Sequence, residues 1–125
     1  MIDFDNGSFF KLSPASSKEG MSLVGPILVQ GEKILETFKT IRDMVIFTNL
    51  RVISINVQGV TGKKKDFTSL PYNRIQAFSV ETAGIFDLDS EMDLWFSGIG
   101  HVRFEIAGRH DVSRLNQEIA EYVLR

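Results

Sequence analysis

Apolar and polar residues alternate along much of the chain from residue 33 onward, which is the period of a β-strand with one buried face. The alternation is clear in RVISINV at 51–57 and in HVRFEIA at 101–107. MVIF at 44–47 is continuously apolar, as expected of a strand that is covered on both faces. The pattern predicts seven strands, at 33–41, 44–47, 51–57, 65–70, 74–82, 91–97 and 101–107.

The period becomes helical at Asp111, a residue type that commonly caps the start of a helix. The following apolar residues form one stripe at helical spacing: Val112, Leu115, Ile119, Tyr122 and Val123. Such a stripe is typical of a helix with one face on a core. We predict an amphipathic helix at 111–124 that covers the open end of an antiparallel barrel or strongly bent sheet.

The first thirty residues are less regular, because Pro14, Gly20, Gly25 and Pro26 interrupt any long helix. We expect one short helix near 16–24, capped by Ser16 or Ser17. The predicted organisation is therefore an N-terminal extension at 1–30 and a domain at 31–125.

Composition narrows the function classes. The chain has 125 residues, the size of one domain with a proper core, and its formal net charge of −2 argues against a dedicated nucleic-acid binder. It has no cysteine, which excludes disulfides and thiolate zinc sites. No apolar stretch reaches the roughly 20 residues that cross a bilayer. Because MIDFDNGSFFKL is acidic where a secretion signal is basic, we expect a cytoplasmic protein.

Seven strands and a terminal helix resemble the pleckstrin-homology (PH) superfold. The stretches RDMVIFTNLRVI, GVTGKK, PY and ETAGIFDLD are together similar to the bacterial PH-domain family, and the resemblance covers about residues 31–125. It implies a mainly β fold, a seven-stranded antiparallel barrel or sandwich capped by a C-terminal α-helix. It also implies binding or scaffolding without catalysis and a tendency to form homo-oligomeric rings, with no known ligand.

The stretch NVQGVTGKKKDF at 56–67 places three lysines, Lys63, Lys64 and Lys65, after a glycine turn. A phosphate-binding Walker loop is excluded, because its glycine spacing is different and a helix must follow it. Two interpretations remain: a solvated hairpin end, or a contact with anionic lipid headgroups worth roughly 1 kcal/mol per lysine. Eukaryotic PH domains that bind phosphoinositides carry basic residues on their first two strands and on the loop between them. The matching stretch here, FKTIRDMV, offers Lys39 and Arg42 and has almost no loop.

No catalytic, metal or cofactor site is predicted. Asp87, Asp89 and Glu91 start like a calcium loop, but the glycine and glutamate that an EF-hand needs further on are missing. His101 and His110 have no cysteine and no helical spacing that would hold zinc. No activated nucleophile is evident, so an enzyme is the weakest of the function classes.

Three apolar residues remain outside the predicted core. Trp95 faces opposite Leu94 and Phe96, so it is either an interface anchor or is covered by the helix or the N-terminal segment. Ile85 and Phe86 lie in a polar connection and either fold over the barrel end or contact another subunit. The preferred hypothesis is a module that assembles with itself, plausibly as a ring, and docks an unidentified protein or peptide. The alternative is weak membrane contact through Lys63, Lys64 and Lys65.

Overall fold

The computed structural model describes residues 1–4, 8–86, 88–108 and 111–125. The elements run in the order β1 (Ser8–Ala15), α1 (Ser17–Val24), η2 (Gly25–Ile27), β2 (Ile34–Lys39), β3 (Met44–Thr48), β4 (Arg51–Gln58), β5 (Lys64–Pro71), η3 (Tyr72–Arg74), β6 (Ile75–Glu81), β7 (Ser90–Phe96), β8 (Gly100–Ile106) and α2 (Val112–Val123). The seven predicted strands and the C-terminal helix are all present.

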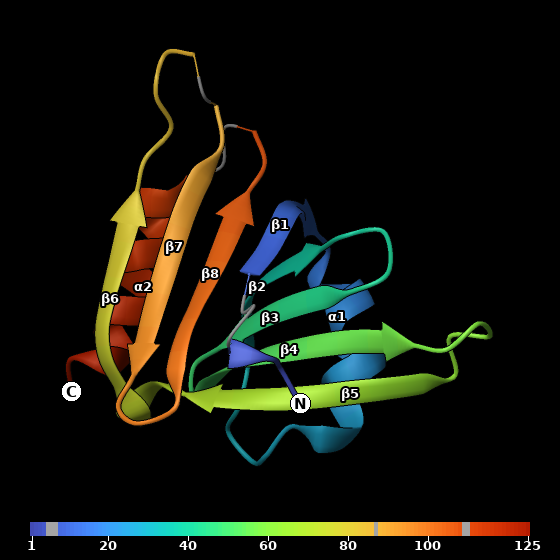
Figure 1. Cartoon of the computed structure of the whole chain (residues 1–125). Coiled ribbons are helices and arrows are strands. Elements are labelled where there is room, and N and C mark those ends of the chain that lie inside the picture. The colour runs from blue at the N-terminus through green and yellow to red at the C-terminus, as the bar shows by residue number, and fades with distance from the viewer. Residues whose placement is uncertain (5–7, 87, 109–110) are drawn as a thin grey trace.

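The strands form one sheet in the order β5-β4-β3-β2-β1-β8-β7-β6. Figure 1 shows the sheet bent into two halves, with β2 to β5 on one side and β6 to β8 on the other. Because β5 and β6 are its free edges, the sheet is a bent sandwich and not a closed barrel. Neighbouring strands are antiparallel except β1 and β8, which are parallel.

The prediction of seven strands was one short, because residues 8–15, which we assigned to an N-terminal extension, form β1. This strand lies between β2 and β8 and therefore joins the two halves of the sheet. Its pairing with β8 shifts register between Phe9 and Leu12, where Lys11 has a positive φ of 54°. The irregularity interrupts the period of two, which explains why the alternation of apolar residues did not reveal this strand.

Strand β3 is buried on both faces, as its continuous apolar run predicted. Met44 and Ile46 pack under α1 in a small cluster with Val24, while Val45 and Phe47 face the main core. Helix α1 begins where predicted, because the Oγ of Ser16 accepts a hydrogen bond from the Glu19 amide at 3.1 Å.

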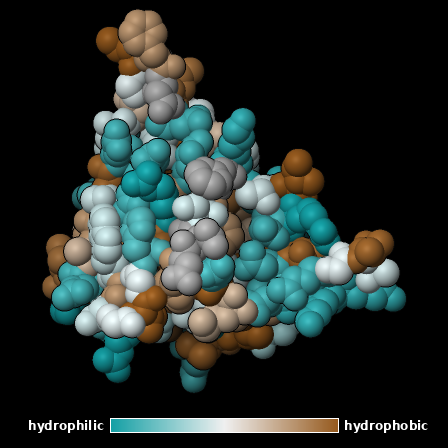
Figure 2. Space-filling view, viewed as in Figure 1, coloured by the Kyte–Doolittle hydropathy of each residue, from teal (hydrophilic) through white to brown (hydrophobic). Residues whose placement is uncertain are grey.

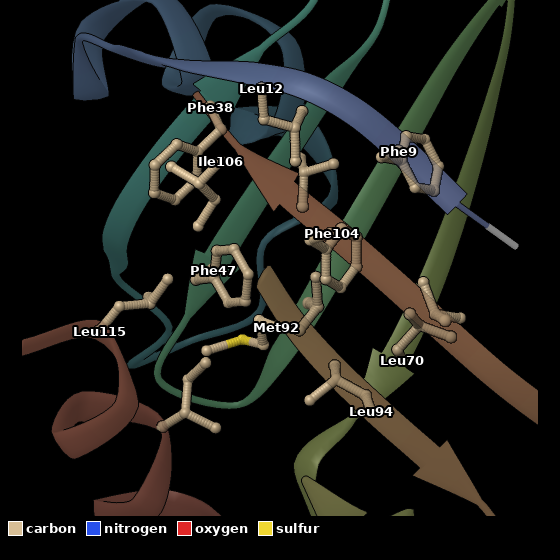
Figure 3. Packing of buried hydrophobic residues seen from close by; sticks show 14 of the residues in the cluster. Phe9, Leu12, Phe38, Phe47, Leu70, Met92, Leu94, Phe104, Ile106 and Leu115 are labelled. Atoms are coloured by element: carbon tan, nitrogen blue, oxygen red, sulfur yellow. The ribbon is translucent and has the colours of Figure 1, made fainter. Parts of the chain in front are cut away.

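The main core lies between the two halves of the sheet, where Phe47 and Phe104 meet edge to face with ring centroids 5.8 Å apart (Figure 3). Helix α2 closes this core with Leu115 and Ile119, both fully buried. The capping prediction holds here too, since Asp111 accepts a hydrogen bond from the Arg114 amide at 3.1 Å.

A buried ion pair fixes the end of the sheet next to the β3–β4 turn. Arg51 donates two hydrogen bonds to Glu32, both at 2.9 Å, and the Glu32 side chain has no exposed surface. Burial opposes ionisation of Glu32, but hydrogen bonds from Arg51, the Thr48 hydroxyl and the Val29 amide outweigh it and lower the pKa of Glu32. Close by, the Tyr72 hydroxyl donates to the Thr48 carbonyl at 2.6 Å.

Candidate functional site

The loop that joins β6 to β7 carries the most exposed aromatic side chain of the described chain. Phe86 is 100% exposed and Ile85 is 86% exposed, with Leu88 partly exposed beside them. The loop projects beyond the ends of β6 and β7 at the top of Figure 1, and apolar surface gathers there in Figure 2. Of the two alternatives for this loop, folding over the end of the barrel is the one that does not fit, because Ile85 and Phe86 are almost fully exposed.

The edge strand that leads into this loop has fewer lysine and proline residues than the opposite edge. Strand β5 carries Lys64, Lys65 and Pro71, residue types that discourage pairing with another strand. Strand β6 reads IQAFSVE and contains neither lysine nor proline. Its outward backbone groups are thus available to an additional strand.

Trp95 lies on the outer face of the β6–β8 half and remains 38% exposed. Its ring stacks on that of His101 in the neighbouring strand, with ring centroids 4.9 Å apart. Below the stack, Asp93 is nearly buried and contacts His101 Nε2 at 2.6 Å and Arg103 Nε at 2.9 Å. Hydrogen bonding to Asp93 raises the already high pKa of Arg103, so the cluster holds a permanent cation next to the carboxylate.

The three lysines lie at a hairpin end, as their glycine turn predicted. Gly59 and Gly62 have positive φ angles of 79° and 69°, which favour glycine in the turn between β4 and β5. Lys63, Lys64 and Lys65 are all exposed there. The structure does not bring them close to Trp95 or Phe86, which belong to the other half of the sheet (Figure 1).

The β2–β3 turn lies beside the β4–β5 turn that carries the lysines, and the sequence had not indicated that these two turns are neighbours. Arg42, in the β2–β3 turn, donates to the Gly59 carbonyl of the β4–β5 turn at 2.7 Å. Each tip carries one fully exposed aliphatic side chain, Ile41 on the first and Val60 on the second. The local sequence could not reveal this pairing, because the two turns are neighbours only in the folded sheet.

Cavities of about 340 to 430 Å³ mark the surface of the described residues. One, about 430 Å³, lies near the first residues, and its lining includes Asp3 and Asp43. A second, about 360 Å³, lies beside η3 and the end of α2; its lining is Asn49, Leu50, Pro71, Tyr72, Asn73, Tyr122 and Arg125. The third, about 340 Å³, includes Glu118 and Glu121 on α2.

The described residues contain no group of three or more histidine, aspartate or glutamate side chains placed to hold a metal ion. Asp89 accepts a hydrogen bond from the Gly108 amide at 3.0 Å, and Glu91 pairs with Arg103 at 3.4 Å. Asp87 and His110 lie outside the described residues. Within the described part of the chain, neither α1 nor α2 is long and apolar enough to cross a membrane.

Comparison with known proteins places this architecture in a family. Residues 3–123 match the model of the bacterial PH domain. The uncharacterized protein YjqA of Bacillus subtilis (strain 168) is 49% identical over 97 residues, 78% of this chain and 75% of that protein.

Two solved structures share the fold. The first is a DUF1696 family protein with a pleckstrin-homology domain from Shewanella loihica PV-4, at 39% identity and a TM-score of 0.78, covering 92% of this chain and 99% of that one. The second is a pleckstrin homology domain from Shewanella amazonensis SB2B, also 39% identical, with a TM-score of 0.66 over 89% and 90% of the two chains. With the bent sheet and capping helix described above, these matches show that the chain belongs to the bacterial PH domain family.

Proposed function

We propose that the protein is a non-catalytic PH-like binding module that assembles with copies of itself. The observation that supports this most directly is the β6–β7 loop, whose Ile85 and Phe86 are almost entirely exposed to water. Exposed apolar groups gathered at one place are typical of surfaces that contact another protein. Strand β6, which leads into this loop, adds an edge without lysine or proline.

The energies indicate that the loop acts together with a second contact. Fully burying two side chains such as Ile85 and Phe86 contributes about 3 to 6 kcal/mol. Association costs an estimated 4 to 15 kcal/mol in lost freedom of motion. The loop alone therefore does not hold two copies together, and backbone pairing along β6 or contacts of Trp95 must add to it.

Size-exclusion chromatography with light scattering, run over a wide range of protein concentrations, tests this proposal. The expected result is one discrete mass that is a multiple of the 14.1 kDa chain. A chain that stays at 14.1 kDa even at the highest concentration would contradict self-assembly.

A second candidate function, weak binding to anionic membranes, is favoured by the paired hairpin tips. Lys63, Lys64 and Lys65 together contribute roughly 3 kcal/mol near an anionic surface. Ile41 and Val60 are exposed on the same two tips, and burial of each in the lipid interface adds about 1.5 to 3 kcal/mol. An apolar tip beside cations is chemically suited to an anionic lipid surface.

Vesicle sedimentation distinguishes this second function. The parent protein is expected to bind vesicles that contain phosphatidylserine and not vesicles of pure phosphatidylcholine. Binding to the phosphatidylserine vesicles should fall when all three lysines are changed to glutamine. The Val60→Asp variant should weaken binding without altering the lysines, whereas Ile99→Ser, an exposed apolar change in the β7–β8 turn, should not. Equal sedimentation with both lipids would count against a contact between the lysines and anionic headgroups, and no sedimentation with either lipid would count against a membrane role.

A further inference from the structure

We propose that the β6–β7 loop of one copy inserts the Phe86 side chain into the cavity beside η3 of the next copy. This inference rests on the proposed self-assembly and names the two surfaces that meet. The receiving cavity is defined by Leu50, Pro71, Tyr72 and Tyr122, with Asn49, Asn73 and Arg125 around them.

Charge favours this cavity over the other two. The stretch 81–89, which includes the loop, carries acidic residues and no basic one. Asp3 and Asp43 line the cavity near the first residues, and Glu118 and Glu121 outnumber Arg114 around the cavity on α2. The η3 cavity is lined by Arg125, which also pairs with Glu121, and by no acidic side chain. It is therefore the cavity whose lining repels the acidic loop least.

The cavity also has the size and the lining that a phenyl ring needs. An apolar cavity of about 150 Å³ holds benzene in a well-studied protein. The η3 cavity, about 360 Å³, has room for the Phe86 ring and for part of Ile85. Its aromatic wall consists of Tyr72 and Tyr122, which stack with centroids 6.2 Å apart.

The wall of this cavity is held in place before any partner binds. Tyr72 is anchored by the hydrogen bond from its hydroxyl to the Thr48 carbonyl at 2.6 Å. The guanidinium carbon of Arg125 lies 5.1 Å from the centre of the Tyr122 ring. A preformed cavity loses little conformational freedom on binding, which favours association.

The loop and the cavity lie at opposite ends of β6. The cavity residues Tyr72 and Asn73 come just before this strand, and the loop follows its last residue, Glu81. Seven residues of strand separate the two by roughly 20 Å. A copy cannot fill its own cavity, so the loop enters another copy. We place this contact head to tail, which produces a ring when the rotation closes and a filament when it does not, whereas reciprocal exchange of loops between two copies would give a closed dimer.

A mixing experiment with two variants tests this arrangement. Phe86→Ser removes the inserted side chain and leaves the cavity, while Leu50→Glu spoils the cavity at an exposed position and leaves the loop. Each variant alone is expected to run as a monomer. A one-to-one mixture is expected to form a dimer, because it retains one intact junction per pair. The matched control Ile99→Ser removes an exposed apolar side chain elsewhere and should assemble like the parent.

The outcomes separate this inference from the proposed function. If the parent chain assembles and either variant alone still assembles like it, the loop-to-cavity contact is overturned while self-assembly stands. Monomeric variants whose mixture also stays monomeric overturn the head-to-tail arrangement. If the parent itself is monomeric, the proposed function fails and this inference fails with it.

A crosslink provides an independent readout, because the chain has no cysteine of its own. The double variant Ile85→Cys, Asn73→Cys keeps Phe86 and places one thiol on each surface. Oxidation of the assembled protein is expected to give a ladder of disulfide-linked species, and neither single variant should crosslink. A single Ile85→Cys variant that crosslinks efficiently would show loop meeting loop and would overturn the proposal.

Discussion

Trp95 and His101 lie face to face across β7 and β8, with their ring planes inclined by 20°. Trp95 is the only tryptophan of the chain, so its fluorescence reports on this one contact. Replacing His101 by alanine removes the stacked ring and opens that face of the indole to water, so we expect the emission maximum of Trp95 to shift to longer wavelength.

Ile99→Ser, an exposed change in the β7–β8 turn, is the control for this experiment, and its emission should match that of the parent. Emission from the His101→Ala variant that is identical to that of the parent would mean that the stack is not formed in solution.

Removing the arginine of the Glu32–Arg51 pair should lower the free energy of unfolding considerably. Arg51→Ala leaves the carboxylate of Glu32 buried without its partner, and loss of one member of a buried pair commonly costs 3 to about 5 kcal/mol. Urea denaturation should show a loss of that size. Lys39→Ala, which breaks the exposed pair with Glu19, should cost less than about 1 kcal/mol. Similar losses in both variants would contradict the difference in burial.

Glu32 should also make stability depend on acid pH. Its folded-state pKa lies below the ordinary value of 4.5, so the unfolded chain binds this proton more readily than the folded chain. The stabilisation is therefore complete above about pH 4.5 and is lost as pH falls through the lower, folded-state pKa. Glu32→Gln should be less stable than the parent at pH 7, and the difference between them should narrow at acid pH. A difference that stays constant with pH would count against this role.

Gly20→Ala should destabilise the protein, although alanine normally favours a helix interior by up to about 1 kcal/mol. An added Cβ at this position would lie 2.8 Å from the Thr37 hydroxyl and 3.2 Å from the Ile46 side chain, because α1 packs tightly on β2 and β3. Overpacking of this kind commonly costs 1 to about 3 kcal/mol. Thermal unfolding should show a lower Tm than in the exposed control Lys18→Ala. A Tm above that of the parent would mean that α1 packs more loosely than described.

The local pattern of apolar residues was sufficient to predict the elements in which buried positions recur regularly along the chain. The all-apolar run of β3 predicted two covered faces, and the stripe of α2 predicted the side on which Leu115 and Ile119 are buried. It failed for β1, whose register shift at Lys11 breaks the alternation.

The candidate sites were harder to predict from the sequence, because the exposure of a side chain depends on which residues lie opposite it in the folded chain. The sequence singled out Ile85, Phe86 and Trp95 as surplus apolar residues, and the structure places the first two in water. It could not show that the tips that carry Ile41 and Val60 are neighbours, since their turns are distant in sequence. The η3 cavity was missed for the same reason: Leu50, Tyr72 and Tyr122 come from three separate segments.

The central position of β1 has a consequence for how the chain is made. Phe9 in β1 is paired with Phe104 in β8, so 104 − 9 = 95 residues separate the partners. At a synthesis rate of about 5 to 20 residues per second, roughly 5 to 19 s pass between the emergence of β1 from the ribosome and that of β8. During that interval one side of an apolar strand is open to other nascent chains, and a chaperone that shields the first fifteen residues would protect the whole sheet.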